Sequence, residues 1–483
     1  MTRRRQFLEQ GLAALAWSGA SGVGQAAEPV DAAALRALER GLHGPLIRLD
    51  HDAYEAAYRF FYWNPTLDLR PAIIARCQHT DDVARCIEFG REQSLPVAVR
   101  GGGHSYLGWG SCDGGLVIDL SPMRDIAVDP LLRTARVGAG VLAHELVDSS
   151  SPYELAAVGG QCRSVGVAGL ALGGGLGWLS GRFGAACDNL LSATVTMADG
   201  RSLEASPTQN TELFWAIRGG GGNFEVVTSL EFRLHPVGNV LAGILAYPLS
   251  DAAAMLEFYR DFMADSPDEL QTTAFLRRDD EEPRLHIVVC YSGDPDQGAR
   301  VLRPLRARQK PLSDTVQVTP YANTLVDTLG DPRSIRGVKG CYLEELSDGA
   351  IEAVLACFAE APHEGAIGLD HYVHGAVCRV DYDATAFELR HPGAFHVWLN
   401  MRWYEPSETA ANLHWADRTW RDLQRYSGDR IYTNYAHTEG AAAARKAYGR
   451  NHARLLAAKR LYDPDNVFKR NQNLEPNAAT TAP

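Results

Sequence analysis

The stretch Arg100-Gly101-Gly102-Gly103-His104-Ser105-Tyr106 closes a strand-like run, 95–100, and joins three consecutive glycines to a histidine. Because glycine has no Cβ, three in a row let the backbone come very close to a flat ring or a pyrophosphate group. A histidine at the end of such a turn can reach an electrophilic carbon of that ring. Taken alone, however, His104 is better explained as an ordinary core side chain.

A second glycine-rich stretch, Gly160-Gln161-Cys162-Arg163-Ser164-Val165-Gly166-Val167-Ala168-Gly169, places a cysteine 58 positions after His104. It runs into a further glycine-dense segment, 173–177. A cysteine in this setting can attack as a thiolate if nearby amide donors stabilise its charge. Alone, Cys162 reads as a structural cysteine; what is distinctive is its occurrence together with His104, in this order and at this spacing.

These stretches resemble the berberine bridge enzyme-like branch of the vanillyl-alcohol oxidase (PCMH-type) FAD-binding oxidoreductases. The resemblance also takes in four motifs toward both ends of the chain, at 213–224, 432–435, 448–451 and 462–468. It implies a bicovalent FAD, with His104 bonded to the 8-methyl group of the flavin and Cys162 bonded to carbon 6.

The glycines and the resemblance together indicate which residues hold the FAD. Glycines permit close backbone approach to the pyrophosphate, and their neighbours position the rings. Besides His104 and Cys162, the expected cofactor-binding residues are Arg100, Gly101, Gly102, Gly103, Ser105, Gly166, Gly169, Gly173, Gly174, Gly222, Asn223, Phe224, Val226, Tyr432 and Asn434.

Tyr435 is the expected catalytic base, because the resemblance assigns proton removal from the substrate to the tyrosine after Asn434. An unperturbed tyrosine has a pKa of about 10, so a cation such as an arginine of the substrate domain is expected to lower it. In an extended strand Tyr432 would lie on the opposite face from Tyr435, so one of the two would face the flavin. Without the resemblance, cross-strand aromatic packing explains both tyrosines.

Two further roles follow from the resemblance. Tyr106 is expected to line the substrate pocket, and Val165 to control the access of dioxygen to the flavin. A valine at this position indicates an oxidase, whereas leucine or isoleucine indicates a dehydrogenase. Three residues depart from the family pattern, so the substrate of a relative is not carried over; they are Glu225, His437 and Leu170.

Short strand and helix patterns in alternation indicate a mixed α+β fold. Residues 72–75, 96–99, 116–120 and 135–139 read as strands, and 80–90 as a capped helix ending at a glycine. Asp199-Gly200 predicts a hairpin turn between two strands. The resemblance implies a two-subdomain PCMH-type FAD-binding domain and a substrate domain whose antiparallel sheet is covered by helices.

We expect the FAD-binding domain at 27–238 and again at 428–476, the substrate domain at 239–427, and a polar tail at 477–483. In the substrate domain, strand 396–403 alternates an apolar face with a polar face. Trp398 and Arg402 on the polar face, with Asp370, are the expected substrate-binding residues. His371, His374, His391 and His396 match no familiar metal-ligand spacing, so no metal is expected.

The N-terminus predicts export. Arginines at 3–5 precede an apolar run, 11–23, which is too short to span a bilayer, and a small-residue site at 24–26. Residues 1–26 therefore read as a twin-arginine signal peptide, and the mature protein as periplasmic or secreted without a membrane anchor. The net charge of −12 argues against a nucleic-acid partner. The spacing of nine cysteines contains no CxxC pair and leaves disulfide pairing open, as the oligomeric state is left open.

The expected function is an oxidase that transfers a hydride from its substrate to FAD and electrons onward to dioxygen. A doubly bonded flavin tolerates an open cleft, which favours a carbohydrate oxidised at its anomeric hydroxyl to a lactone. The alternatives are oxidation or oxidative cyclisation of an aromatic alcohol or alkaloid-like metabolite, a dehydrogenase with another acceptor, and a redox-idle binding module.

Overall fold

The computed structural model describes residues 30–279, 282–326, 331, 333–428, 430–436 and 438–477. The predicted signal peptide, the tail beyond Asn477 and His437 lie outside these residues. Within them, no helix is both long and apolar enough to cross a membrane.

The first sheet has four strands and carries the first glycine stretch at its end. Its order is β1-β2-β4-β3, with β2 and β3 both parallel to β4. Helix α3 (Thr80–Glu92) packs against it through Val83, Cys86 and Ile87, as the periodicity predicts. The strands are β1 (Leu46–Arg48), β2 (Ile73–Arg76), β3 (Val97–Arg100) and β4 (Leu116–Asp119), preceded by α1 (Ala32–Gly41) and α2 (Tyr54–Tyr58).

The second sheet has six strands in the order β5-β6-β10-β8-β9, with β7 paired to β10, and all its pairs are antiparallel. The hairpin predicted at Asp199-Gly200 joins β8 to β9, and Gly200 has the positive φ of +81° that such a turn needs. The elements are β5 (Ile126–Asp129), β6 (Thr134–Gly138), α4 (Ala143–Ser150), β7 (Leu155–Ala157), α5 (Val167–Leu172), α6 (Ser180–Phe183), β8 (Leu190–Met197), β9 (Ser202–Ala205), α7 (Thr211–Gly220) and β10 (Glu225–Pro236).

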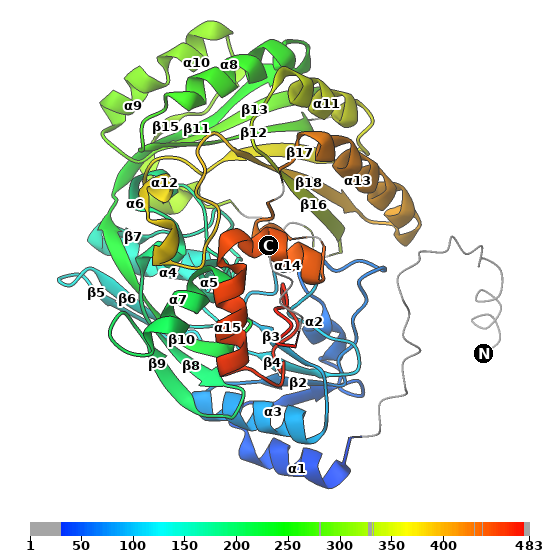
Figure 1. Ribbon diagram of the computed structural model, residues 1–483. Coiled ribbons are helices and arrows are strands. Elements are labelled where there is room, and N and C mark those ends of the chain that lie inside the picture. Colours follow the sequence, from blue (N-terminus) through cyan, green and yellow to red (C-terminus); the bar gives the residue numbers. More distant parts are fainter. Residues whose placement is uncertain are drawn as a thin grey trace.

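The third sheet has eight antiparallel strands and lies across the first two, with helices on its outer face (Figure 1). On β18, Val397, Leu399 and Met401 are buried in the core beneath these helices, so the predicted apolar face is confirmed. The strands are β11 (Asn239–Pro248), β12 (Leu270–Asp279), β13 (Glu282–Tyr291), β14 (Ser313–Asp314), β15 (Gln317–Pro320), β16 (Ile335–Leu343), β17 (Ala366–His371) and β18 (Phe395–Trp403); the helices are α8 (Ala252–Ala264), α9 (Pro295–Val301), α10 (Arg303–Arg308), α11 (Asp348–Ala359) and α13 (Thr409–Leu423).

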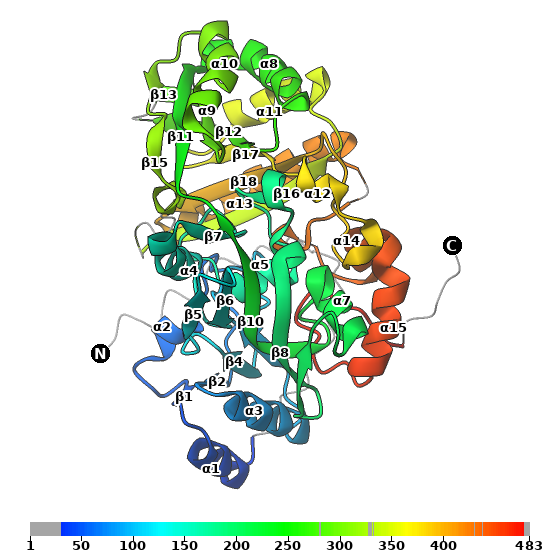
Figure 2. The same cartoon turned by 90° about the vertical axis from the view of Figure 1, so that its left-hand side faces the viewer.

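The chain then returns to the FAD-binding side through α14 (Ala441–Tyr448) and α15 (His452–Tyr462), which lie beside the first two sheets (Figure 2). Lys459 on α15 is fully buried; it is ion-paired to Asp463 at 2.7 Å and donates to the backbone oxygen of Asn223, also at 2.7 Å. This buried cation ties the C-terminal helix to the loop before β10.

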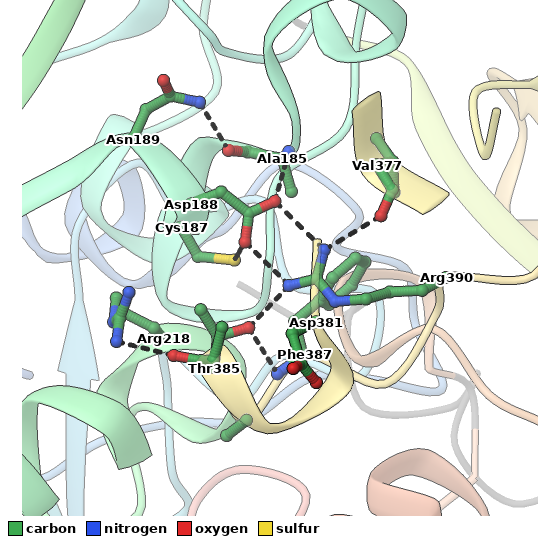
Figure 3. A network of polar contacts seen from close by, with 12 residues as sticks. Ala185, Cys187, Asp188, Asn189, Arg218, Val377, Asp381, Thr385, Phe387 and Arg390 are labelled. Carbon is green, nitrogen blue, oxygen red and sulfur yellow. Dashed lines mark hydrogen bonds and ion pairs between the residues drawn. The ribbon is translucent and has the colours of Figure 1, made fainter. Parts of the chain in front are cut away.

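A buried ion pair ties the third-sheet side to the second sheet (Figure 3). Arg390, which follows α12 (Ala376–Arg379), donates to Asp188 Oδ1 at 2.7 Å, and neither side chain is more than 7% exposed. The same guanidinium donates to Thr385 Oγ1 and to the carbonyl of Val377. Asp188 belongs to the 3₁₀ turn before β8.

Candidate active site

The two glycine stretches, far apart in sequence, touch backbone to backbone. A Cβ at Gly102 would lie 2.8 Å from the Cα of Gly166, and one at Gly166 would lie 3.0 Å from the Cα of Gly102. Both approaches are closer than real Cβ contacts, so neither position accepts a side chain without movement. His104 then reaches across to the second stretch, where its Nε2 lies 2.9 Å from Ser164 Oγ.

His104 is half-buried and lies under a stack of side chains. The Phe61 ring lies parallel to the imidazole at 4.1 Å, and the guanidinium of Arg336 on β16 lies 4.2 Å from the centre of that ring. Burial, with the positive charge of Arg336, lowers the pKa of His104 to about 4. The imidazole is therefore neutral near pH 7 and keeps a nucleophilic lone pair.

Cys162 lies close to the same aromatic group. Cys162 is half-buried; its backbone forms an isolated parallel β-bridge with Val326, and its carbonyl accepts from the amide of Val165. A charge on this sulfur would raise the pKa of Tyr62, Tyr106 and Tyr435, so the sulfur lies within electrostatic reach of the three tyrosines. His104 meets Tyr62 edge-on at 6.2 Å, so the two predicted attachment points face one wall.

A cavity of about 190 Å³ runs from the two glycine stretches toward the C-terminal loop. Six of the predicted FAD-binding residues line it: Gly101, Gly169, Gly173, Gly222, Val226 and Asn434. Gly169 and Gly222 have open space where a Cβ would stand, as a close approach of the cofactor requires. These residues fit FAD. The C-terminal wall consists of Phe468, which ends the motif at 462–468, and of Arg470, Asn471 and Gln472, to which the sequence analysis assigns no role.

Several other predicted FAD residues support this cavity without lining it. Arg100 donates to the carbonyl of Ala57 at 2.6 Å, and Ser105 Oγ accepts from the amide of Trp109. Gly103 and Gly174 have positive φ angles of +69° and +115°, which glycine adopts without strain.

Hydrogen bonds and burial also fix the loop before β10, which contains three further residues of interest. The buried amide of Asn223 donates to the Tyr448 hydroxyl at 2.9 Å, and its oxygen accepts from the amide of Leu474. Phe224 is fully buried in the core. Glu225 lines the cavity, its carboxylate accepts from the amides of Gly222 and Phe224, and burial raises its pKa to about 8.

A second cavity, of about 270 Å³, lies between the third sheet and the 427–446 segment. His396 and Tyr435 share one wall, with their rings stacked 4.0 Å apart. Tyr106 meets Tyr435 at 5.3 Å, so the tyrosine predicted to line the substrate pocket is in contact with the predicted base. The other lining residues are Gly340, Cys341, Tyr342, Trp420, Gln424, Ser427, Gly428, Arg430, Ile431, Tyr432, Thr438, Glu439, Ala442, Ala443 and Lys446.

The prediction that a nearby arginine lowers the pKa of Tyr435 is wrong. Burial first, and then the negative charge of Asp370, raise the pKa of Tyr435 well above its usual value, and no cation is among the main groups that shift it. Arg402 lies six residues along β18 from His396, roughly 20 Å away in an extended strand. It is instead ion-paired with Glu364 at 2.9 Å and is about one-third exposed.

The predicted opposite orientation of Tyr432 and Tyr435 is also wrong. Residues Thr433–Tyr435 form a 3₁₀ turn, which brings positions three apart to one side, and the two rings meet edge-on at 4.9 Å. The turn is set by distant partners: Thr433 Oγ1 donates to the carbonyl of Gly173, and Asn434 Nδ2 to that of Leu170.

Asp370 lies at the centre of a buried polar network rather than free to bind a substrate hydroxyl. Its Oδ1 accepts from Trp398 Nε1 at 3.0 Å and from Thr273 Oγ1 at 2.9 Å, and its Oδ2 lies 3.2 Å from His396 Nδ1. Thr273 also contacts the Tyr372 hydroxyl at 2.7 Å. Among the described residues, no cluster of three or more His, Cys, Asp or Glu could hold a metal ion.

The fold and the paired glycine stretches define an FAD-dependent oxidoreductase. Residues 71–206 match the family described as FAD binding domain, and residues 431–475 the family described as berberine and berberine like. (R)-6-hydroxynicotine oxidase of Paenarthrobacter nicotinovorans is 30% identical over 461 residues, covering 90% of this chain and 97% of the relative. The protein belongs to the berberine bridge enzyme-like family of FAD-linked oxidoreductases.

Solved structures give the same result for the fold. The crystal structure of 6-hydroxy-D-nicotine oxidase from Arthrobacter nicotinovorans has a TM-score of 0.82 at 28% identity, covering 90% of this chain and 98% of that one. Xylooligosaccharide oxidase from Myceliophthora thermophila has a TM-score of 0.82 at 24% identity, covering 93% of this chain and all of that one, which speaks for the fold alone.

Proposed function

We propose that this protein is an exported oxidase with a bicovalent FAD that oxidises a small aromatic or heteroaromatic alcohol or amine and passes the electrons to dioxygen. The observation that carries the proposal is the 270 Å³ cavity walled by His396, Tyr435 and Tyr432, in ring contact with Tyr106 near the two attachment points. Its volume is just below the usual range of small-molecule sites and suits one or two rings.

Bicovalent attachment is supported by the chemistry of the two side chains. His104 is neutral and directed by Ser164, and Cys162 lies beside the same aromatic wall. Each bond replaces one hydrogen on the flavin and one on the side chain, and the two electrons released pass to dioxygen, which leaves as hydrogen peroxide. A doubly bonded cofactor cannot be lost outside the cytoplasm, which agrees with the proposed twin-arginine export.

When bound, the FAD supplies the acceptor for the substrate hydride and hands the electrons to dioxygen. The chain supplies the remaining functions. Tyr106 and Tyr435 offer ring faces against which a flat substrate stacks. The eight-stranded sheet supplies one wall of the cavity through Gly340, Cys341, Tyr342 and His396.

A carbohydrate oxidised at its anomeric hydroxyl is the second candidate. The outer part of the cavity carries hydrogen-bonding side chains that suit sugar hydroxyls, namely Gln424, Ser427, Arg430, Thr438 and Glu439. A peroxide-coupled screen separates the two candidates, with coniferyl alcohol and both enantiomers of 6-hydroxynicotine on one side and glucose, cellobiose and xylobiose on the other. Peroxide from the sugars alone would reject the aromatic proposal.

The covalent links are tested by the intact mass of the denatured protein recovered from the exported fraction. We expect wild type to lack residues 1–26 and to carry one FAD, and His104→Ala and Cys162→Ala each to keep the FAD through the remaining bond. The double variant should lose it on denaturation. A wild-type protein that releases its FAD would contradict bicovalent attachment, and a retained N-terminus would contradict export.

A further inference from the structure

His396 and Asp370 form a buried dyad that faces the second cavity. They are direct cross-strand partners, Asp370 on β17 and His396 on β18, so their side chains project on the same side of the sheet. His396 Nδ1 lies 3.2 Å from Asp370 Oδ2, and the two side chains are 7% and 5% exposed. The carboxylate is itself fixed by Trp398 and Thr273, so it holds the imidazole in one orientation.

The other ring nitrogen of His396 is available. Nε2 is buried and has no hydrogen-bond partner among the described residues, although His396 lines the 270 Å³ cavity. The neighbouring strand leaves room for it, because a Cβ on Gly340 would lie 2.9 Å from this nitrogen. With Nδ1–H donated to Asp370, Nε2 carries the lone pair, and buried polar atoms are rarely left unpaired without a function.

Tyr435 is poorly suited to accept a proton. Its pKa is raised by burial and by the charge of Asp370, so the hydroxyl stays neutral and has no free charge to accept a proton. The Tyr435 ring instead stacks on the imidazole of His396, with the ring centres 4.0 Å apart and the planes at 13°. This stacking restricts the orientation of the imidazole.

We propose that His396 Nε2 is the proton acceptor in substrate oxidation and that Asp370 is its positioning partner. The carbon of the substrate C–H bond gives up its hydrogen with both electrons to the FAD, while the O–H or N–H proton passes to Nε2 and a C=O or C=N bond forms. Dioxygen then takes the two electrons and two protons and leaves as hydrogen peroxide, which returns His396 to its neutral state. This role deepens the proposed function and rests on it.

The pH dependence of the rate of flavin reduction should show whether the His396–Asp370 dyad accepts the proton of the substrate. The titratable and charged groups around His396 are Asp370 on β17, Tyr435 on the 3₁₀ turn, Cys341 and Tyr342 on β16, and Arg430, Glu439 and Lys446 across the cavity. Burial raises the pKa of Cys341 to about 12 and also raises that of Tyr342, so both stay neutral between pH 5 and 9. The rate of flavin reduction by wild type should therefore rise with pH, as it does when an enzyme group accepts the proton of the substrate.

The test is anaerobic stopped-flow reduction of the flavin by the most active compound of the screen. We expect His396→Ala to slow reduction by about 10²–10⁴-fold, in the range of lost general-base catalysis, and to lose the rise with pH. Added imidazole should restore part of the rate, which a purely structural defect would not allow. Tyr435→Phe should lose less than about tenfold. His391→Asn, at a histidine bonded to the Tyr382 hydroxyl instead, is the matched control and should behave as wild type.

The contrary results are equally definite. A larger loss in Tyr435→Phe than in His396→Ala, or a His396→Ala variant that imidazole does not rescue, would overturn the proposal. If no compound reduces wild type, the proposed function fails, and the dyad is judged by ¹⁵N-histidine NMR of the holoenzyme. There we expect His396 as the Nδ1–H tautomer in wild type and its loss in Asp370→Asn; a wild-type Nε2–H tautomer would reject the dyad.

Discussion

At the scale of the residue, we expect Val165 to control whether dioxygen reaches the flavin. It lies three residues after Cys162, half-buried, and its carbonyl accepts from the amide of Ala143 at 2.9 Å, which fixes the backbone there. We expect Val165→Leu to slow reoxidation of the reduced enzyme by dioxygen by about tenfold or more, because the added methylene narrows the approach. Reduction by substrate should be unchanged, and equal reoxidation rates in both proteins would remove the argument for an oxidase.

The residues that the sequence identified are those with a local signal. His104, Cys162 and the glycines beside them have a distinctive local pattern, and the structure brings the two stretches together. The pairing of Asp370 with His396 has no such signal, because it depends on the register of two strands and joins positions 26 apart. The position of Arg402 could not be predicted for the same reason. The alternation of residues shows which face of the strand Arg402 lies on, but not how far along the strand it lies from the site.

At the scale of the element, the contact between the two glycine stretches positions both proposed attachment residues, His104 and Cys162. We expect Gly102→Ala to destabilise the protein by roughly 1–3 kcal/mol and to reduce covalent FAD, because its Cβ would press on the Gly166 backbone, which cannot move aside as a side chain would. Gly159→Ala is the matched control, since no atom lies within 4 Å of its Cβ position. Intact mass and chemical denaturation measure the two effects, and equal FAD content in both variants would contradict this role.

Strands and helices with strong periodicity were predicted well, and turns set by distant partners were not. Helix α3 and the β8–β9 hairpin follow from local patterns that the sequence contains in full. The 3₁₀ turn at Thr433–Tyr435 is fixed instead by hydrogen bonds to Gly173 and Leu170, about 260 positions earlier. The local sequence predicts an extended segment here. The tertiary contacts override this weak local preference and produce the turn.

At the scale of the whole molecule, the C-terminal return of the chain links the third sheet to the FAD-binding side. Residues of α14 and of the segment before it line the second cavity together with strands of the third sheet, and the loop after α15 lines the first cavity together with residues of the first two sheets. The surroundings of His104, a proposed attachment residue, also come from both sides, because its ring stacks on Phe61 and the guanidinium of Arg336 on β16 lies over the Phe61 ring. A change that weakens the packing between the third sheet and the FAD-binding sheets would therefore disturb the cofactor site and the substrate site together.

The buried pair Arg390–Asp188 is where this coupling is best tested (Figure 3). Removing one partner leaves a charge in a dry interior, so we expect Asp188→Asn and Arg390→Met each to cost about 3–5 kcal/mol in urea unfolding. The double variant should lose less than the sum, because neither charge is then stranded. The exposed pair Arg454–Glu212, also at 2.7 Å, is the matched control; water screens it, so Arg454→Met should cost about 0–1 kcal/mol. Equal losses at the two sites would show that burial of the pair, and with it this link between the halves, contributes nothing.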